Sequence, residues 1–379
     1  MNTEVSSRSL GLFDRVRSVG IVGLGLIGGS VGLALKGRTN IERVVGFDAD
    51  SRAAAAAVEC GAIDEVASSM EDLASSADLV VVAIPVDLVP GVLDRIAGYV
   101  GSSAVVTDVG SAKAEVVAAG EGCLGTSFVG GHPMAGSERH GIDAASADLF
   151  EDAWWIVTPT SGTDSGAYAT VTAMVSALGA RPVALDPVAH DALVARLSHL
   201  PQLTASALVD VAIAAGDRDA LLGLAGAGFR DVTRIAASNP DLWVAVIRSN
   251  RQAVLESLGG LDRRLAAVTS MIATQRWDEL RSWLDRSRKA RLEVFAKPDF
   301  EGEPVGLTLM VPDRPGVLAE VTTAAGELGA NIEDLRIVHS TEGGQGRLEL
   351  VVSGPERAES LVGALMRLGY RVERSEVDI

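Results

Sequence analysis

The sequence predicts an α/β fold class: a doubly wound parallel sheet, then an all-helical domain, then a small ferredoxin-like βαββαβ domain. Three observations support this prediction. From Ser18 to about residue 187, short apolar runs alternate with helical stretches. From 188 to 297 the strand signals stop, and apolar residues recur at three- and four-residue spacing. After a polar linker, 304–379 has the pattern strand, helix, strand, strand, helix, strand. We therefore expect three domains, 18–187, 188–297 and 304–379.

Short apolar runs define the strands of the predicted sheet. Most are apolar throughout, which is typical of strands covered on both faces. The runs are 19–22, 44–47, 79–84, 104–107, 128–130, 154–157 and 182–185. In the helical domain we expect breaks at Asn239-Pro240 and Gly259-Gly260. A helical domain of this size often completes its burial against a second copy, so we expect a dimerisation domain and a homodimer.

Composition limits the partners and the compartment. The chain has 33 Lys+Arg and 50 Asp+Glu, a formal net charge of −17, which repels a phosphate backbone and an anionic lipid surface. We therefore expect neither nucleic acid nor membrane as a partner. The first residues lack the pattern of a signal peptide, and no window reaches about 18 apolar residues. Cys60 and Cys123 have no metal or redox spacing, which favours a reducing cytoplasm.

A glycine-rich loop follows the first strand and opens the first helix. Gly23, Gly25 and Gly28 form a G-x-G-x-x-G pattern. In a Rossmann-type domain the first glycine makes a tight turn, the second lets the backbone approach a pyrophosphate, and the third lets helix and strand pack closely. The helix N-terminus adds free N–H groups and a positive dipole end. The loop therefore predicts a dinucleotide site.

Asp48, at the end of the second strand, decides which dinucleotide is expected. In Rossmann-type domains, a carboxylate about 20 residues after the glycine loop binds the adenosine ribose hydroxyls. Asp48 lies close to that distance from the loop. A carboxylate there repels a 2′-phosphate, so NAD is favoured over NADP. We also expect Ile27, in the loop, and Pro85, after the strand 79–84, to contact the cofactor.

Two further strands end in glycine followed by polar side chains, in the segments 107–113 and 130–138. The carboxyl ends of parallel strands are where an open α/β sheet binds its ligand. Ser111 and His132 are therefore expected side by side near the nicotinamide. A neutral imidazole there could take the proton of a substrate hydroxyl while hydride leaves the same carbon. This is the chemistry of an alcohol oxidised to a ketone.

At this point the sequence resembles the prephenate dehydrogenase family over roughly residues 18–297. It carries that family's glycine loop, Asp-Val-Gly-Ser from Asp108, and Gly-His-Pro-Met-Ala-Gly-Ser-Glu from Gly131. The helical half adds His190-Asp191, Ser198-His-Leu-Pro-Gln202 and Phe229-Arg-Asp-Val-Thr-Arg-Ile-Ala236. The resemblance implies that His132 accepts the proton of the C4 hydroxyl, with Ser111 orienting it, and that Arg234 binds a substrate carboxylate. Oxidative decarboxylation would then give 4-hydroxyphenylpyruvate, with no metal needed.

The resemblance also implies less specific substrate contacts. A glutamate such as Glu138 stands at the mouth of the pocket in relatives, with Asp231 and Trp243 reaching it from the helical domain or from a partner subunit. Many relatives have a second histidine where this chain has Gln202. Because a neutral amide can bind a keto or an amino group, the substrate stays open between prephenate and arogenate. His199 is expected in the core or behind the substrate, and His140 and His339 at the surface.

The C-terminal segment from Leu307 to Leu318, with Gly329-Ala-Asn-Ile332, resembles an ACT domain. Asp313 and Gly316 would form the first strand-to-helix turn, where backbone amides can approach a small zwitterion, and Asn331 would begin the second strand. In this setting the resemblance implies a regulatory site for tyrosine. The alternative is a dimerisation module without a ligand.

The sequence disfavours two rival functions, an enzyme of another class and a non-enzymatic sensor. A β-hydroxyacid dehydrogenase also joins a dinucleotide domain to a helical one, but it relies on a lysine in the helical domain. Residues 188–288 contain no lysine here. A non-enzymatic sensor of NAD and an amino acid would not need a proton acceptor such as His132 beside the nicotinamide. Both observations favour the dehydrogenase.

Overall fold

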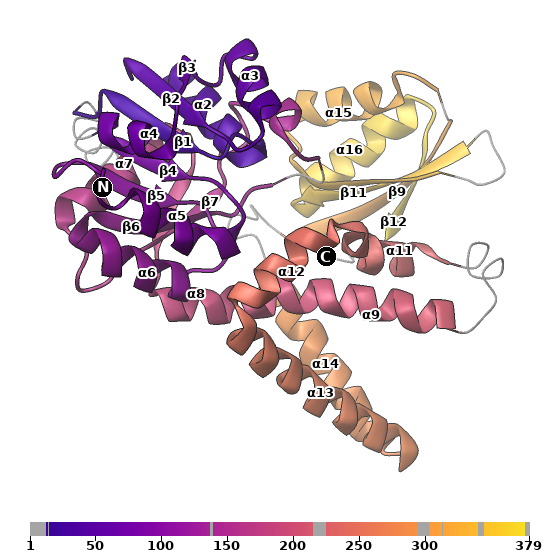
Figure 1. Cartoon of the computed structure of the whole chain (residues 1–379). Helices are drawn as coiled ribbons and strands as arrows, with labels where there is room; N and C mark the ends of the chain where they lie inside the picture. Colours follow the sequence, from indigo (N-terminus) through magenta and orange to yellow (C-terminus); the bar gives the residue numbers. More distant parts are fainter. Residues whose placement is uncertain are drawn as a thin grey trace. The chain divides into compact units, whose positions relative to one another are not determined.

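The computed structural model (Figure 1) describes residues 13, 15–136, 139–214, 225–294, 303–312, 314–339 and 345–375. Its contacts divide the chain into two compact units, Met1–Leu265 and Ala266–Ile379. The division falls within one long helix, α13 (Arg251–Ala273). The predicted break at Gly259-Gly260 is therefore wrong, because this helix continues through both glycines, each of which is tolerated in a helix at about 1 kcal/mol.

The first unit contains an eight-stranded sheet in the order β3-β2-β1-β4-β5-β6-β7-β8. The strands are β1 (Ser18–Val22), β2 (Arg43–Phe47), β3 (Glu65–Val66), β4 (Leu79–Val82), β5 (Val105–Asp108), β6 (Phe128–Pro133), β7 (Trp154–Thr158) and β8 (Arg181–Ala184). All seven predicted runs form strands. The structure adds β3, whose two exposed residues carry no apolar run.

The last two strands depart from the predicted parallel arrangement. Strands β1 to β6 pair in parallel, but β7 runs antiparallel to β6 and parallel to β8. A parallel pair needs a long crossover, usually a helix. In its described part, the connection from β6 to β7 holds only the short turn η3 (Ile142–Ala144), so the chain returns in the opposite direction. The sheet is doubly wound, with an antiparallel edge.

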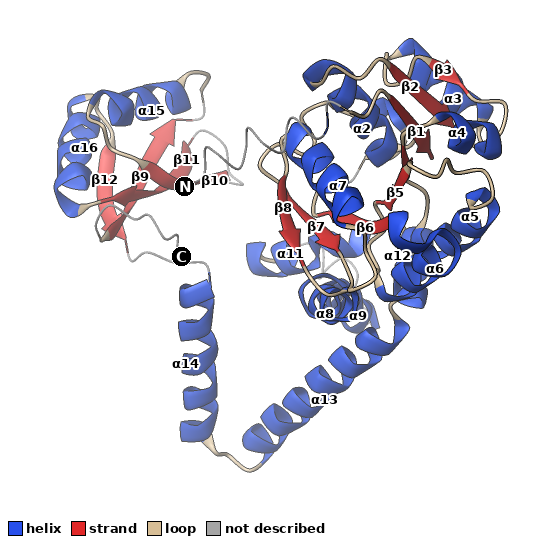
Figure 2. Ribbon diagram, turned by 90° about the vertical axis from the view of Figure 1, so that its left-hand side faces the viewer, coloured by secondary structure: helices blue, strands red, loops and turns tan. Residues whose placement is uncertain are grey.

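Helices cover both faces of the sheet (Figures 1 and 2). One face carries α2 (Leu26–Arg38), α3 (Ser51–Glu59) and α7 (Ser165–Ala177), and the other α4 (Met70–Ser76), α5 (Val89–Ile96) and α6 (Ala114–Leu124). Strand β4 shows why its sequence is apolar throughout. Leu79 and Val81 join one core while Val80 and Val82 join the other, because successive side chains point to opposite faces.

Helices follow the sheet in the same unit, as predicted. They are α8 (Pro187–Val194), the π-helical turn η4 (Ala195–His199), α9 (Leu200–Ala214), α11 (Ala227–Thr233), the 3₁₀ turn η5 (Arg234–Ala237), α12 (Pro240–Ser249) and the start of α13. Asp186 begins α8 by accepting the backbone N–H groups of Val188 and Ala189 at 2.9 and 3.0 Å.

The second unit holds the rest of α13, α14 (Trp277–Val294) and a small α/β domain (Figure 2). That domain runs β9 (Pro304–Pro312), α15 (Val317–Glu327), β10 (Ile332–His339), β11 (Gln345–Ser353), α16 (Pro355–Arg367) and β12 (Arg371–Ser375). Its antiparallel sheet has the order β10-β11-β9-β12. The predicted ferredoxin-like βαββαβ topology is confirmed.

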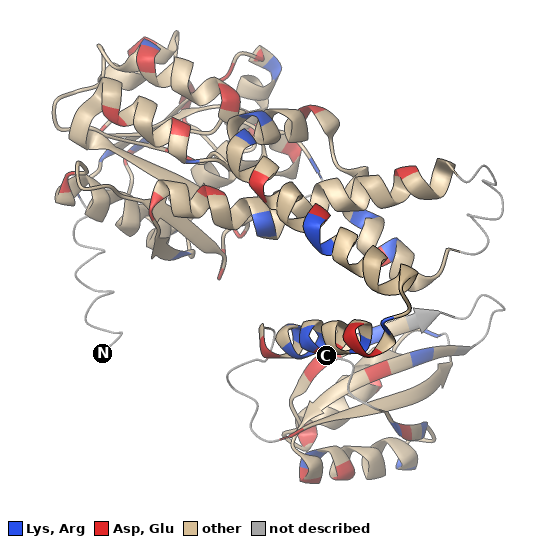
Figure 3. Cartoon of the chain, turned by 90° about the horizontal axis from the view of Figure 1, so that it is seen from below, with Lys and Arg blue, Asp and Glu red and all other residues tan. Residues whose placement is uncertain are grey.

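Charged positions are spread over both units (Figure 3). Acidic residues outnumber basic ones, which accounts for the net charge of −17. None of the helices in the described part of the chain is both long and apolar enough to cross a membrane.

Candidate functional site

A pocket of about 570 Å³ lies at the carboxyl ends of the central strands, within the first unit. The sheet contributes the glycine loop, the ends of β4 and β5, and β6. The helical part contributes η4 and α12. Six of the residues predicted from the sequence line it, namely Gly25, Ile27, Pro85, Ser111, His132 and Trp243. The pocket therefore joins the predicted cofactor loop to the predicted catalytic pair.

The glycine loop has the shape that a dinucleotide needs. Gly23 has φ +95°, and a Cβ there would lie 2.3 Å from the carbonyl oxygen of Ala83. A Cβ on Gly28 would lie 1.9 Å from the carbonyl oxygen of Gly23, whereas one on Gly25 would meet nothing within 4 Å. The first and third glycines are thus required by packing, and the second leaves open space beside the start of α2. No side chain caps that helix start, so its N–H groups can bind phosphate.

Asp48 lies half-buried at the end of β2, beside this loop. Its carboxylate accepts the N–H of Leu24 at 2.7 Å and the N–H of Asp50 at 2.8 Å. Each carboxylate oxygen retains a lone pair for a further donor. The loop and Asp48 therefore fit the phosphates and a ribose diol of NAD.

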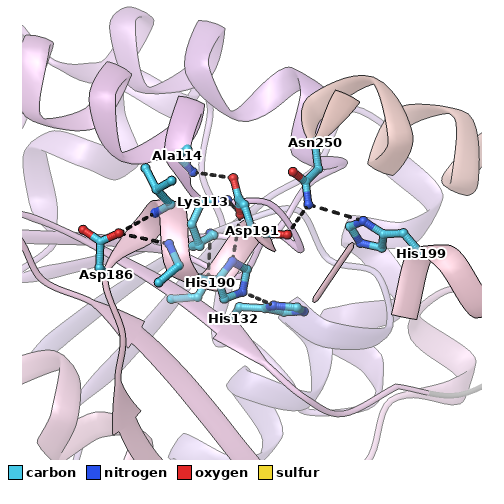
Figure 4. A network of polar contacts seen from close by, with 12 residues as sticks. Lys113, Ala114, His132, Asp186, His190, Asp191, His199 and Asn250 are labelled. Atoms are coloured by element: carbon cyan, nitrogen blue, oxygen red, sulfur yellow. Dashed lines mark hydrogen bonds and ion pairs between the residues drawn. The ribbon is translucent and has the colours of Figure 1, made fainter. Parts of the chain in front are cut away.

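His132, on β6, is the first member of a hydrogen-bonded chain (Figure 4). Its Nδ1 lies 2.8 Å from Nε2 of His190, whose Nδ1 lies 2.8 Å from Oδ1 of Asp191. The same carboxylate accepts the backbone N–H groups of Lys113 and Ala114 at 2.7 and 2.9 Å, which begin α6. Asp191 therefore caps α6 from another helix and anchors the chain. Because Nδ1 of His132 is occupied, Nε2 is the ring nitrogen left for a ligand.

The surroundings keep His132 uncharged. Burial lowers its pKa well below 6.5, and the neighbouring His190, Lys113 and His199 lower it further. At neutral pH the ring is therefore a neutral imidazole, which is the form that can accept a proton.

A buried ion pair joins the end of β5 to the neighbouring strand β6. Nζ of Lys113 contacts the Asp108 carboxylate and donates to the carbonyl of Gly131 at 2.8 Å. The Asp108 carboxylate also accepts the N–H groups of Gly110 and Gly131 at 2.8 and 3.2 Å. Both charged side chains are fully buried. This pair links β5 to the residue before His132, and nothing in the sequence pattern marked it as more than part of a polar segment.

Comparison with known proteins gives the family. The model "Prephenate dehydrogenase, nucleotide-binding domain" matches residues 31–184, "Prephenate dehydrogenase, dimerization domain" matches 186–286, and "AHAS small subunit-like ACT domain" matches 307–370. The prephenate dehydrogenase of Bacillus subtilis is 32% identical over 356 residues, which cover 91% of this chain and 95% of that protein. The chain belongs to the prephenate dehydrogenase family.

Solved structures agree with the family assignment. Prephenate dehydrogenase from Aquifex aeolicus, in complex with hydroxyphenyl propionate and NAD⁺, is 32% identical with a TM-score of 0.69, covering 73% of this chain and 98% of that one. Arogenate dehydrogenase from Synechocystis is 31% identical with a TM-score of 0.65, covering 73% and 99%. The resemblance seen in the sequence motifs to the prephenate dehydrogenase family is confirmed.

The residues that the resemblance to prephenate dehydrogenases placed at the substrate lie in different environments. Trp243 lines the pocket, half-buried, and its indole Nε1 has no hydrogen-bond partner among the described residues. Gln202 is buried one turn after His199, and its Oε1 also lacks a partner there, but it is not among the residues that line the pocket. Arg234 and Asp231 lie exposed on η5 and α11, away from the pocket lining, and Glu138 lies outside the described residues.

The remaining histidines differ in environment. His199 is buried, lines the pocket, packs edge-on against Trp243 with ring centroids 5.9 Å apart, and contacts Nδ2 of Asn250 at 3.4 Å. Asn250 also donates to the carbonyl of Asp191 at 2.8 Å. His140 is exposed, as expected, yet it borders the same pocket. The side chain of His339 lies outside the described ones.

The ACT-like domain has a smaller pocket of about 240 Å³ at its first strand-to-helix turn. Gly316 lines it with φ +93°, a conformation that favours glycine. Arg314 lies beside it and pairs with Glu320. Asn331 is exposed and donates to Glu333, outside this pocket, and Asp313 is outside the described residues.

His199 gives a testable dependence of stability on pH. Burial, its largest cause, lowers the pKa of His199 to about 4, with His190 adding to the effect and Asp191 opposing it. An unfolded histidine titrates near 6.5, so the unfolded chain binds more protons between pH 6.5 and 4. The free energy of unfolding should fall as pH drops through this window, by at most roughly 3 kcal/mol from this group. Urea unfolding at pH 7 and pH 5 should show a smaller loss in His199→Gln than in the wild type. Equal losses would contradict this assignment.

Proposed function

We propose that this chain catalyses the NAD⁺-dependent oxidative decarboxylation of prephenate to 4-hydroxyphenylpyruvate. The observation that carries the proposal is His132, a neutral imidazole whose Nε2 remains available in a pocket that also contains the cofactor loop. The Aquifex aeolicus relative binds hydroxyphenyl propionate and NAD⁺. Prephenate dehydrogenase activity in this chain is the function that joins these facts.

In the proposed mechanism His132 Nε2 accepts the proton of the C4 hydroxyl, and Ser111 orients that hydroxyl. The glycine loop and Asp48 would hold NAD⁺, which would supply the hydride acceptor for C4. Breaking the bond from C1 to its carboxylate releases carbon dioxide, and its electron pair aromatises the ring as a phenolate. His132 then returns its proton to the phenolate oxygen. The residues thus store and restore one proton, and aromaticity supplies the driving force.

The substrate carries two carboxylates, so a cation is needed. No Lys or Arg is among the described residues that line the pocket. We propose Arg234 as the carboxylate partner, because a planar guanidinium can form two charge-assisted hydrogen bonds. Asp231, Glu138, Gln202 and Trp243 are proposed as further contacts. Trp243 has the most direct support among these, because it lines the pocket.

Removing Arg234 should weaken substrate binding. Losing one charge-assisted pair of about 1.5 to 3 kcal/mol raises KM roughly 10- to 100-fold in Arg234→Ala. The matched control is Arg230→Ala, one turn earlier on α11 and also exposed. Steady-state kinetics with varied prephenate would measure both. If Arg234→Ala has the same KM for prephenate as the wild type, another group binds the substrate carboxylates.

Arogenate is the second candidate substrate. Gln202 and the similarity to the arogenate dehydrogenase of Synechocystis both support it. Arogenate carries an amino group where prephenate has a keto group, and an amide can bind either. The test compares NADH formation from prephenate and from arogenate. Faster turnover of prephenate supports the proposal, and oxidation of arogenate alone would replace it with direct formation of tyrosine.

We further propose a homodimer with domains at 18–187, 188–297 and 304–379. Support comes from the matched dimerization-domain model and from exposed apolar side chains on the helices, such as Val188, Leu197 and Val211, at 67, 70 and 72% exposure.

Tyrosine is proposed as an effector at the ACT-like pocket, through Asp313, Gly316 and Asn331. Adding tyrosine to the same NADH assay tests this effect. The free thiols Cys60 and Cys123 suit the proposed reducing cytoplasm.

A further inference from the structure

His190 is a buried titratable group that the reaction above does not use. It is fully buried on α8, and each of its ring nitrogens has one partner. A neutral imidazole has one N–H donor and one acceptor, so the two contacts cannot be independent. If the partner of one ring nitrogen is an acceptor, that nitrogen carries the proton, and the other ring nitrogen must then accept a hydrogen bond.

Asp191 sets the direction of this chain. Its Oδ1 accepts the N–H of Lys113 at 2.7 Å, its Oδ2 accepts that of Ala114 at 2.9 Å, and a carboxylate at the start of α6 is favoured by the helix dipole. An ionised carboxylate only accepts, so His190 Nδ1 must be the donor. Nε2 of His190 is then an acceptor, and His132 must donate through Nδ1. The lone pair of His132 is thereby placed on Nε2.

The anchor of the chain is itself held in place. Nδ2 of Asn250 donates to the carbonyl of Asp191 at 2.8 Å, and Asp186 caps the helix on which His190 and Asp191 lie (Figure 4). The carboxylate thus links α8 to α6 by hydrogen bonds that are buried or nearly so. His190 has little freedom to flip its ring, because either flip would break a contact of 2.8 Å.

We propose that His190 is a positioning residue that, through Asp191, holds the resting His132 in the Nδ1–H tautomer and so keeps Nε2 ready to accept the substrate proton. His190 touches neither the pocket nor the reacting atoms. When His132 gains a proton on Nε2, its Nδ1–H still points at an acceptor, so the imidazolium is stabilised without rearrangement. This inference rests on the proposed function only for its effect on turnover.

The tautomer can be measured directly in the full-length protein. The chain has five histidines, so ¹⁵N-labelled histidine gives few imidazole signals, and His132 is the one lost in His132→Asn. At pH 7 we expect His132 in the wild type to carry its proton on Nδ1. In Asp191→Ala, His190 Nδ1 loses the carboxylate to which it donates, so the His190 tautomer is no longer fixed and the His132 proton should no longer be held on Nδ1. Wild-type His132 protonated on Nε2 would overturn the inference.

Kinetics separate positioning from simple space filling. His190→Leu removes the acceptor and should lower kcat roughly 10- to 100-fold, with little change in the KM for substrate. His190→Gln places an amide oxygen near the Nε2 position and should recover most of that loss. Equal losses in both variants, with the His132 tautomer unchanged, would reduce His190 to a packing role. If the Nδ1–H form is found but neither prephenate nor arogenate is oxidised, the proposed reaction fails and this inference stands.

Discussion

His132→Asn should lower kcat by a factor of about 10² to 10⁴, which is the usual contribution of a positioned general base to the rate. Asparagine keeps a polar side chain on β6 but cannot accept and store a proton at neutral pH. The glycine loop and Asp48 come from other strands, so the Kd for NAD⁺, measured by calorimetry, should stay close to that of the wild type. Turnover within tenfold of the wild type would remove His132 from the mechanism.

The pH profile provides a second check on His132. Because burial holds its pKa well below 6.5, the base is unprotonated at neutral pH. The kcat of the wild type should therefore stay level as the pH falls from 7 to 6.5, and decline only at lower pH as the imidazole takes up a proton. A decline centred near 7 would indicate that another group, or a His132 with a raised pKa, controls the reaction.

Gly28→Ala should remove most NAD⁺ binding and destabilise the fold. The new methyl group would lie 1.9 Å from the carbonyl oxygen of Gly23, so α2 and the loop must separate. Overpacking of this kind costs about 1 to 3 kcal/mol of stability. Losing two charge-assisted hydrogen bonds to phosphate, at about 1.5 kcal/mol each, weakens NAD⁺ binding about a hundredfold. Thermal unfolding and calorimetric titration would measure the two effects.

Two other glycines give matched controls for this prediction. Gly37→Ala lies in the same helix, where the new Cβ would meet nothing within 4 Å, so it should stabilise the fold by about 0.5 to 1 kcal/mol and leave NAD⁺ binding unchanged. Gly25→Ala also meets no protein atom within 4 Å, so it should fold normally yet weaken NAD⁺ binding by filling the space for the phosphates. Normal NAD⁺ affinity in both Gly25→Ala and Gly28→Ala would place the cofactor elsewhere.

Predictions based on local pattern succeeded for the sheet and for the loop. The apolar run of β4 predicted a strand buried on both faces, and its residues divide between two cores. The direction of a strand in the sheet could not be predicted in this way, because an apolar run has the same composition in a parallel and in an antiparallel strand. The antiparallel course of β7 depends on a connection without a crossover helix, which the pattern did not reveal.

The predicted substrate residues show the same division. Trp243 reaches the pocket, but Arg234 and Asp231 lie outside its lining on η5 and α11. The sequence motifs predicted the positions of these residues in the chain and the chemistry of their side chains. Their distance from His132 depends on how separate helices pack, and for these residues the substrate role stays a prediction.

The order of elements, the glycine turn, the carboxylate of Asp48 after β2 and the family could all be predicted from the sequence, because each is encoded by residues close together in the chain. Tertiary structure alone decided that His190 and Asp191 reach His132 and the start of α6, across 58 and 77 positions. Packing of α8 against α6 creates those contacts. A single hydrogen-bond direction can be fixed there because the groups are buried, since water would otherwise compete for each donor and acceptor.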